Sequence, residues 1–155
     1  MLVQKVISGG QTGADIAGLL AAKECGIPTG GTAAYKFMTE NGPNPSLETL
    51  FGLKEQDTKF VDYKDRTIKN VLDSNGTIVF QEKESVGSIF TVKVCMRARK
   101  PYWINPSLGD ILFFVGLHEI SELNIAGNRE SVSPGIQDRI YSLLLKAFKE
   151  DPLEE

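Results

Sequence analysis

The chain has 155 residues, of which 41% are hydrophobic and 24% are charged. This is the size and balance of one globular domain with a single core. Lys and Arg total 17 against 20 acidic residues, so the net charge is -3. Binding to a phosphate backbone requires a basic surface, so no nucleic-acid partner is expected.

The apolar segments are short. The longest run, residues 111–117, is well below the roughly 20 residues that cross a bilayer, so no membrane partner is expected. Residues 1–7 lack the basic region and cleavage site of a secretory signal, which predicts a cytoplasmic protein. Cys25 and Cys95 lie far apart in the sequence and are predicted to be core thiols. With one histidine, His118, no metal site is expected.

Predicted strands alternate with predicted helices along the chain. The strands are 2–7, 77–81, 102–104 and 123–126; the helices are 14–25, 62–72, 87–100, 109–118 and one that begins at Ser133-Pro134. Residues 30–54 predict a long loop with at most a short strand, and 102–104 a buried strand. This order is typical of an α/β fold, a single Rossmann-like domain at 1–149 with a mostly parallel sheet flanked by helices. Residues 150–155 form an acidic tail. Ligands of such sheets bind at the carboxyl ends of the strands.

The first candidate site separates the first strand from the first helix. It reads Ser8-Gly9-Gly10-Gln11-Thr12-Gly13-Ala14-Asp15. Glycines let backbone N–H groups approach a phosphate, and the helix N-terminus adds about half a positive charge. Gln11 and Thr12 add side-chain donors. The P-loop lysine and the GxGxxG spacing are absent, so neither ATP hydrolysis nor standard dinucleotide binding follows. The alternative is a tight turn in which Asp15 stabilises the helix start.

The second candidate site follows the last predicted strand and reads Gly127-Asn128-Arg129-Glu130-Ser131. Arg129 is the natural phosphate ligand, and Ser131 adds a hydroxyl. Glu130 suits either hydrogen bonds from ribose hydroxyls or the role of a general base. The alternative is that Arg129 and Glu130, as sequence neighbours, are both solvated.

A third, weaker candidate lies at another strand-to-helix junction, Ser85-Val86-Gly87-Ser88. Gly87 and Ser88 suit an anion there. Ser88 is equally suited to capping the helix, which needs no ligand. No GxSxG elbow is present, which argues against a hydrolase with a catalytic triad.

The ordered series of motifs resembles the molybdenum cofactor carrier family, part of the SLOG superfamily of Rossmann-like nucleotide-binding domains. The similarity covers most of the chain. It is carried by residues 7–15, Gly26-Ile27-Pro28, Gly30-Gly31, residues 40–45, Tyr63, Arg66-Thr67, Asn70-Val71, residues 74–77, residues 123–131 and Pro134-Gly135-Ile136. The resemblance implies a pocket for a nucleotide-like or pterin-like phosphate ligand, formed by the loops named above. Related SLOG domains include phosphoribohydrolases and sensors of ADP-ribose derivatives.

Three positions depart from the family pattern. Ile16 replaces a basic residue, Thr32-Ala33-Ala34 replaces a Trp-Cys-Pro run, and Asn128 replaces a proline. These changes remove a positive charge and a thiol suited to a metal or pterin. Nucleotide-type binding is therefore favoured over molybdenum carriage.

The sequence predicts non-catalytic binding of a small phosphorylated, nucleotide-derived ligand, such as an ADP-ribose-type signal, for sequestration (a sponge) or carriage. Residues 9–13 would hold one phosphate and Arg129 with Ser131 another, while Asp15 or Glu130 would bind ribose. No cofactor is required, although the molybdenum cofactor is an alternative ligand. The rival hypotheses are a nucleotide or nucleoside-phosphate hydrolase that uses Glu130 or Asp15, and an interaction module with a vestigial pocket. The apolar segment 111–117 favours a homo-oligomer.

Overall fold

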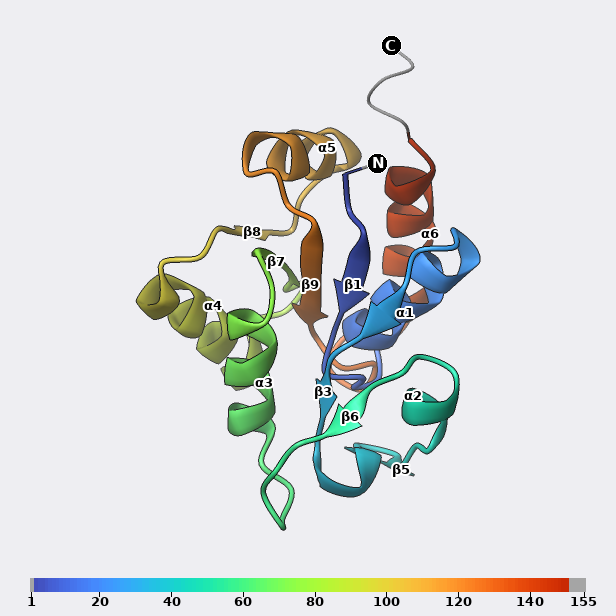
Figure 1. Cartoon of the computed structure of the whole chain (residues 1–155), viewed down its shortest axis with the longest axis vertical. Coiled ribbons are helices and arrows are strands. Elements are labelled where there is room, and N and C mark those ends of the chain that lie inside the picture. The colour runs from blue at the N-terminus through green and yellow to red at the C-terminus, as the bar shows by residue number, and fades with distance from the viewer. Residues whose placement is uncertain (1, 151–155) are drawn as a thin grey trace.

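A computed structural model describes residues 2–150 and contains one five-stranded sheet (Figure 1). The strand order is β2 (Thr29–Gly30), β1 (Lys5–Ile7), β9 (Glu122–Gly127), β7 (Gly76–Phe80) and β8 (Tyr102–Ile104). All four neighbouring pairs are parallel. Parallel strands require crossover connections, and the intervening helices supply them. The predicted single Rossmann-like α/β fold is confirmed.

Helices cover both faces of the sheet. On one face, α1 (Ala14–Glu24), α5 (Leu108–Leu117) and α6 (Ile136–Lys149) enclose the main core; on the other lie α3 (Tyr63–Leu72) and α4 (Val86–Ala98) (Figure 1).

Side chains along β9 alternate between the two faces, as the pleat of a strand requires. Leu123 and Ile125 join the main core, whereas Asn124 bonds Thr77 on the opposite face. Gly18 brings α1 close to this strand, because a Cβ there would come within 2.8 Å of Ile125. The face beneath α3 and α4 therefore carries polar groups in its interior.

The segment predicted as a loop at 30–54 is a packed unit instead. It contains β3 (Thr32–Ala33), η1 (Tyr35–Phe37), β4 (Met38–Thr39), β5 (Gly42–Pro43), α2 (Ser46–Thr49) and β6 (Lys54–Glu55). β3 pairs with β6 in parallel, and β4 pairs with β5 antiparallel. Leu47, Phe51 and Leu53 bury themselves against Leu19 of α1. These apolar residues have no regular period in the sequence, so the prediction went no further than a short strand in this segment.

Two further predictions need correction. The predicted buried strand at 102–104 is β8, which lies at the sheet edge and leaves Ile104 39% exposed, because only β7 pairs with it. The last helix begins at Ile136 rather than at Pro134. Gly135, with φ of 86°, is left-handed and cannot be part of the helix.

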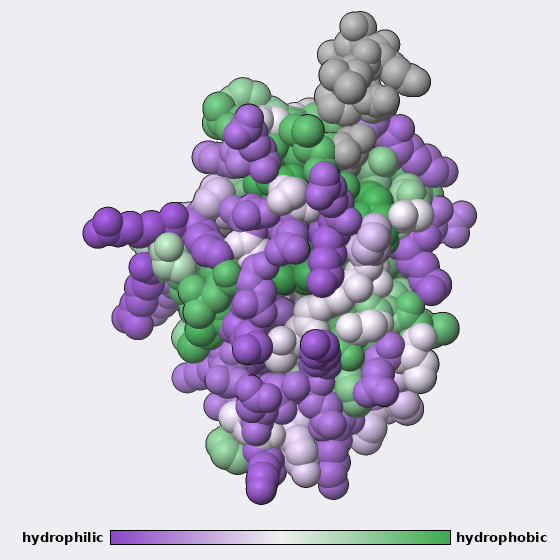
Figure 2. Space-filling view, viewed as in Figure 1, coloured by the Kyte–Doolittle hydropathy of each residue, from purple (hydrophilic) through white to green (hydrophobic). Residues whose placement is uncertain are grey.

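Within residues 2–150, no helix has both the length and the apolar character to span a membrane. Figure 2 shows hydrophilic side chains over most of the face in view, with hydrophobic ones gathered near α5. Phe113 and Leu117 of α5 are 58% and 61% exposed. Self-association through this helix stays a prediction. Of the predicted acidic tail, only Glu150 lies among the described residues.

Candidate functional site

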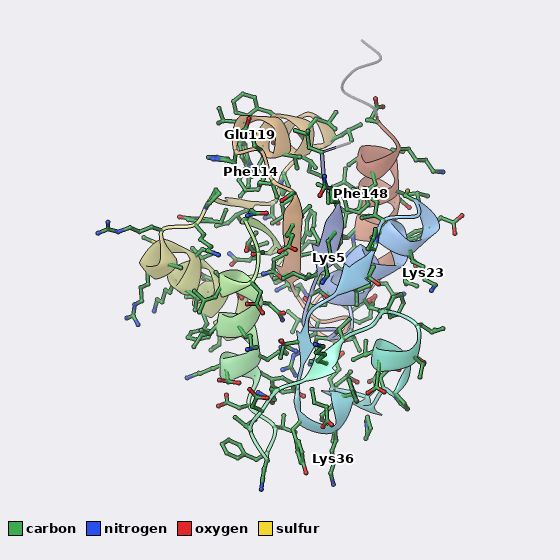
Figure 3. All side chains as sticks on the ribbon, in the orientation of Figure 1. Lys5, Lys23, Lys36, Phe114, Glu119 and Phe148 are labelled. Atoms are coloured by element: carbon green, nitrogen blue, oxygen red, sulfur yellow. The ribbon has the colours of Figure 1, made fainter. Side chains whose placement is uncertain are left out.

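A pocket of about 420 Å³ lies at the carboxyl edge of β1, β9 and β7, below α3 and α4. Figure 3 places Phe114 and Phe148 at the opposite, amino edge of the sheet. The pocket is lined by Gly9, Gln11, Asp15, Tyr63, Lys64, Arg66, Thr67, Asn70, Ser85, Val86, Gly87, Phe90, Thr91, Asn124, Ile125, Ala126, Gly127, Arg129, Ser131 and Val132. Its volume is within the range of small-molecule sites.

Helix α3 supplies the lining that the loops do not. The Asp62 side chain caps the helix by accepting hydrogen bonds from the backbone N–H groups of Lys64 and Asp65. Helical spacing then puts Tyr63, Arg66 and Asn70 on one face, directed at the sheet. Asn70 fixes the helix in place, because its amide accepts from Thr32 N at 2.8 Å and donates to Thr32 O at 2.9 Å.

Arg66 is a buried cation with incomplete hydrogen bonding. Its side chain is 9% exposed, and Nη1 donates to Gly9 O over 3.5 Å, the limit of a hydrogen bond. Within residues 2–150, Nε has no acceptor. The guanidinium carbon lies 5.0 Å from the centre of the Tyr63 ring. Burial lowers the pKa of Arg66, and the nearby Asp15 charge opposes that effect.

Arg129 approaches the same aromatic ring from the loop after β9. Its guanidinium carbon lies 4.9 Å from the Tyr63 ring centre. In the part of the chain that the structure describes, the ion pair within 4 Å joins Arg139 to Glu82 and involves neither of these two arginines. Arg66 and Arg129 therefore face the pocket without a paired carboxylate.

Asp15 is the one carboxylate among the lining residues. It is 5% exposed, and Oδ2 accepts from Gln11 N at 3.1 Å. Burial raises the pKa of Asp15 to about 6, against the opposing charges of Arg66 and Arg129. The carboxyl group therefore changes charge just below neutral pH.

Gln11 presents a second buried donor to the pocket. Its Oε1 accepts from Thr12 N at 3.0 Å and from Glu40 N at 2.9 Å, which fixes the orientation of the amide. Nε2 is buried without an acceptor in residues 2–150. Gln11 and Arg66 thus leave two N–H groups unsatisfied at the same site.

The structure divides the predicted site residues into two sets. Seven line the pocket: Gly9, Gln11, Asp15, Gly87, Gly127, Arg129 and Ser131. Six lie outside the lining: Gly10, Thr12, Gly13, Ser88, Asn128 and Glu130. The second set stabilises the loops that carry the first.

Ser88, Asn128 and Glu130 make contacts of this structural kind. Ser88 lies at the third position of α4 and forms a capping box with Ser85, which is the N-cap residue in place of Ser88. The Asn128 amide bonds both N and O of Lys83 at 2.9 Å. Glu130 Oε1 accepts from Gly135 N at 2.8 Å at the entry to α6, whereas Oε2 is buried without a donor in residues 2–150.

Glu40, which sequence analysis did not select as a site residue, joins three loops. Its carboxylate accepts hydrogen bonds from the hydroxyls of Thr12 and Ser131 and from Ser131 N. The Thr12 hydroxyl in turn accepts from Glu130 N at 3.2 Å. Glu40 therefore links the packed 30–54 segment to both predicted phosphate loops.

The sequence analysis also missed the pocket residues on α3 and α4. These are Tyr63, Lys64, Arg66, Thr67, Asn70, Phe90 and Thr91. A signal was present, because Tyr63, Arg66 and Asn70 form a polar and aromatic stripe at helical spacing. Such a stripe is usually a solvated face, so the sequence alone did not indicate its burial.

The fold agrees with comparisons to known proteins. The model of the circularly permutated YpsA SLOG family matches residues 6–148. The chain belongs to this family. No curated protein matches the SLOG chain. It is similar to the crystal structure of a protein from Syntrophus aciditrophicus SB named "putative molybdenum carrier protein", with 34% identity, 96% of each chain covered and a TM-score of 0.84.

The family resemblance found in the sequence is thereby confirmed. Membership of the SLOG family and the name of the neighbour both support a ligand-binding role. The identity of the ligand is a separate question, which depends on the chemistry of the pocket.

Proposed function

We propose that this SLOG domain binds a small phosphorylated ligand of the nucleotide type and holds it without catalysis, for sequestration or carriage. The observation that carries the proposal is the pair of buried donors without acceptors in residues 2–150, Arg66 Nε and Gln11 Nε2, in a pocket that the Arg129 guanidinium also lines. Buried donors without partners cost free energy, and an anionic acceptor removes that cost.

The donors match phosphate in kind as well as in number. A guanidinium presents a planar fork of N–H groups that fits phosphate oxygens. The first turn of α4 adds the N–H groups of Val86 and Gly87, because the Ser85 side chain caps only Ser88 N. A Cβ at Gly87 would meet no atom within 4 Å, so the space beside this turn is open.

The pocket also offers apolar surface to the rest of a nucleotide. Val86, Phe90, Ile125 and Val132 line it beside the polar residues. A free phosphate ion would leave most of the roughly 420 Å³ unfilled. A planar base attached to the phosphate would instead bury this wall, which favours a nucleotide-sized ligand.

A hydrolase is the second candidate, and Asp15 is the reason. A carboxyl group with a pKa of about 6 suits a general base at neutral pH. Glu130, the other predicted catalyst, is not among the lining residues of the pocket. Because Asp15 has no second carboxylate beside it in the lining, binding without turnover is proposed first.

Carriage of the molybdenum cofactor is supported by the neighbour's name alone. The two arginines suit the phosphate of a pterin cofactor. Neither Cys25 nor Cys95 is among the lining residues, so the pocket offers no thiolate to the metal. A phosphorylated ligand without a metal therefore ranks ahead of it.

The test is mass spectrometry of the small molecules released when the purified protein is denatured after incubation with a metabolite extract. The proposal expects release of an intact phosphorylated nucleotide derivative. This ligand should be lost from Arg129→Ala and retained by the control Arg139→Ala, because Arg139 pairs with Glu82 and does not line the pocket. Recovery of a hydrolysis product without the intact nucleotide, together with recovery of the intact nucleotide from Asp15→Asn, would establish the hydrolase. Empty protein would contradict both, and molybdenum in the released fraction would favour the cofactor carrier.

A further inference from the structure

Two guanidinium groups meet at one aromatic ring in the pocket. Arg66 and Arg129 have their guanidinium carbons 5.0 and 4.9 Å from the centre of Tyr63. Both cations are therefore held within about 10 Å of each other, although like charges repel. The electron-rich ring stabilises each cation, so Tyr63 offsets part of this repulsion.

The unsatisfied donors of the pocket fall into two adjoining groups. On the β1 side, Arg66 Nε and Gln11 Nε2 are buried without acceptors in residues 2–150. On the β9 and β7 side are the Arg129 guanidinium and the first-turn N–H groups of Val86 and Gly87. Strand order places β9 between β1 and β7, so the two groups are neighbours across the sheet edge.

We infer that the ligand carries two adjoining phosphates, one bound by Arg66 with Gln11 and the other by Arg129, and that Tyr63 is the residue that positions the two arginines. This inference rests on the proposed function, which it deepens by naming a diphosphate. A single phosphate satisfies one donor group and leaves the other unpaired. Two phosphates at opposite ends of a ligand would not meet cations that share one ring.

Charge supports the same assignment. Asp15 is the one carboxylate in the lining, and both arginines lie close enough to influence its ionisation. Three cations in the lining, Lys64, Arg66 and Arg129, and one buried anion leave a positive site over which a diphosphate spreads its charge. A terminal phosphate would concentrate about two negative charges at one of the two groups.

The test compares two pairs of ligands that differ in the number of phosphates, and in the first pair the total charge is nearly the same. ADP-ribose carries its two charges on a diphosphate, and AMP carries nearly two on one phosphate at neutral pH. Pyrophosphate and phosphate serve as probes that lack a base. Calorimetry at constant ionic strength is expected to give roughly tenfold tighter binding for the diphosphate of each pair.

Variants identify the residues responsible. Arg66→Ala and Arg129→Ala are each expected to reduce the diphosphate preference to near unity, whereas Arg139→Ala keeps it. Tyr63→Leu is expected to reduce the preference and Tyr63→Phe to retain it, because phenylalanine keeps the ring. A loss in Tyr63→Leu that affects mono- and diphosphates equally would overturn the positioning role. Thermal unfolding checks that each variant is folded.

The outcomes separate this inference from the proposed function. Equal affinity for AMP and ADP-ribose would overturn the inference that the ligand carries a diphosphate. The proposal that the pocket binds a phosphorylated ligand would still stand. If none of the four probes binds, the number of phosphates on the ligand recovered from the metabolite extract decides whether the inference holds. A recovered ligand with one phosphate overturns the inference, and one with a diphosphate supports it. If nothing is recovered either, the proposed function fails with it.

Discussion

The guanidinium of Arg66 occupies the space that a side chain at Gly9 would need. A Cβ on Gly9 would come within 2.6 Å of Arg66 Nε and 2.7 Å of its guanidinium carbon. The first residue of the glycine loop therefore admits an arginine from a distant helix, whereas the backbone N–H groups of the next three residues donate to Ser8, Asp15 and Gln11. This contact joins two parts of the chain that are 57 positions apart.

Gly9→Ala is expected to displace Arg66 and weaken binding of phosphorylated ligands by roughly tenfold, with a stability loss of about 1–3 kcal/mol from overpacking. Gly116→Ala is the matched control, because a Cβ there meets no atom within 4 Å. Gly116 lies in α5, so its replacement by alanine is expected to raise the free energy of unfolding by up to about 1 kcal/mol without changing ligand affinity. Calorimetry and urea unfolding measure both quantities. Unchanged affinity in Gly9→Ala would show that Arg66 does not need this space.

The raised pKa of Asp15 predicts that the free energy of unfolding depends on pH. Its pKa is raised from 3.8 to about 6 on folding, so the folded state favours the protonated carboxyl. The free energy of unfolding is therefore lowered as pH rises from about 4 to about 6, and the cost is constant above that. Asp15→Asn is expected to be more stable than the parent at pH 7, by at most about 3 kcal/mol, and equal to it near pH 4. Urea unfolding across this range measures the difference; a constant difference would contradict the prediction.

Asp15 also predicts that anion affinity depends on pH. Ionisation of Asp15 places a negative charge beside Arg66 and Arg129, so affinity for ADP-ribose is expected to fall severalfold as pH rises through about 6. ADP-ribose is the suitable probe, because its diphosphate has no group that titrates there. Asp15→Asn should bind with little change over the same range. Calorimetry at pH 5, 6 and 7 makes the comparison, and an equal pH dependence in both proteins would assign it to another group.

Glu40→Gln is expected to loosen the two phosphate loops. Burial opposes ionisation of Glu40, but hydrogen bonds from Ser131 and Thr12 outweigh it and lower its pKa. The stabilisation is therefore present above the unfolded pKa of 4.5 and is lost as pH falls through the folded value. At pH 7 the variant should lose about 1 kcal/mol of stability and bind ligand more weakly.

Hydrogen exchange at residues 129–131 tests this role directly. Faster exchange there in Glu40→Gln is the expected result, because Ser131 N donates to Glu40. Glu48→Gln, on α2 of the same segment, serves as the control. Unchanged exchange in both variants would mean that Glu40 does not hold the loop.

Sequence reasoning found part of the site because some signals are local. A strand, a glycine loop and a helix in succession indicate an anion site, and Gly9, Gln11 and Asp15 line the pocket. Thr12 and Asn128 belong to the same motifs, yet their side chains bond Glu40 and Lys83 instead. Which way a polar side chain in a loop points depends on partners that are distant in sequence.

The sequence by itself determined the alternation of strands and helices, the parallel sheet and the edge of the sheet at which the pocket lies. These follow from hydrophobic periodicity and from backbone preferences within a few residues. The tertiary structure alone decided that Arg66 and Tyr63 face the pocket beside Arg129, and that the 30–54 segment packs on α1. The physical reason is that burial of a polar side chain depends on which elements cross above it, and short-range patterns carry no record of that crossing.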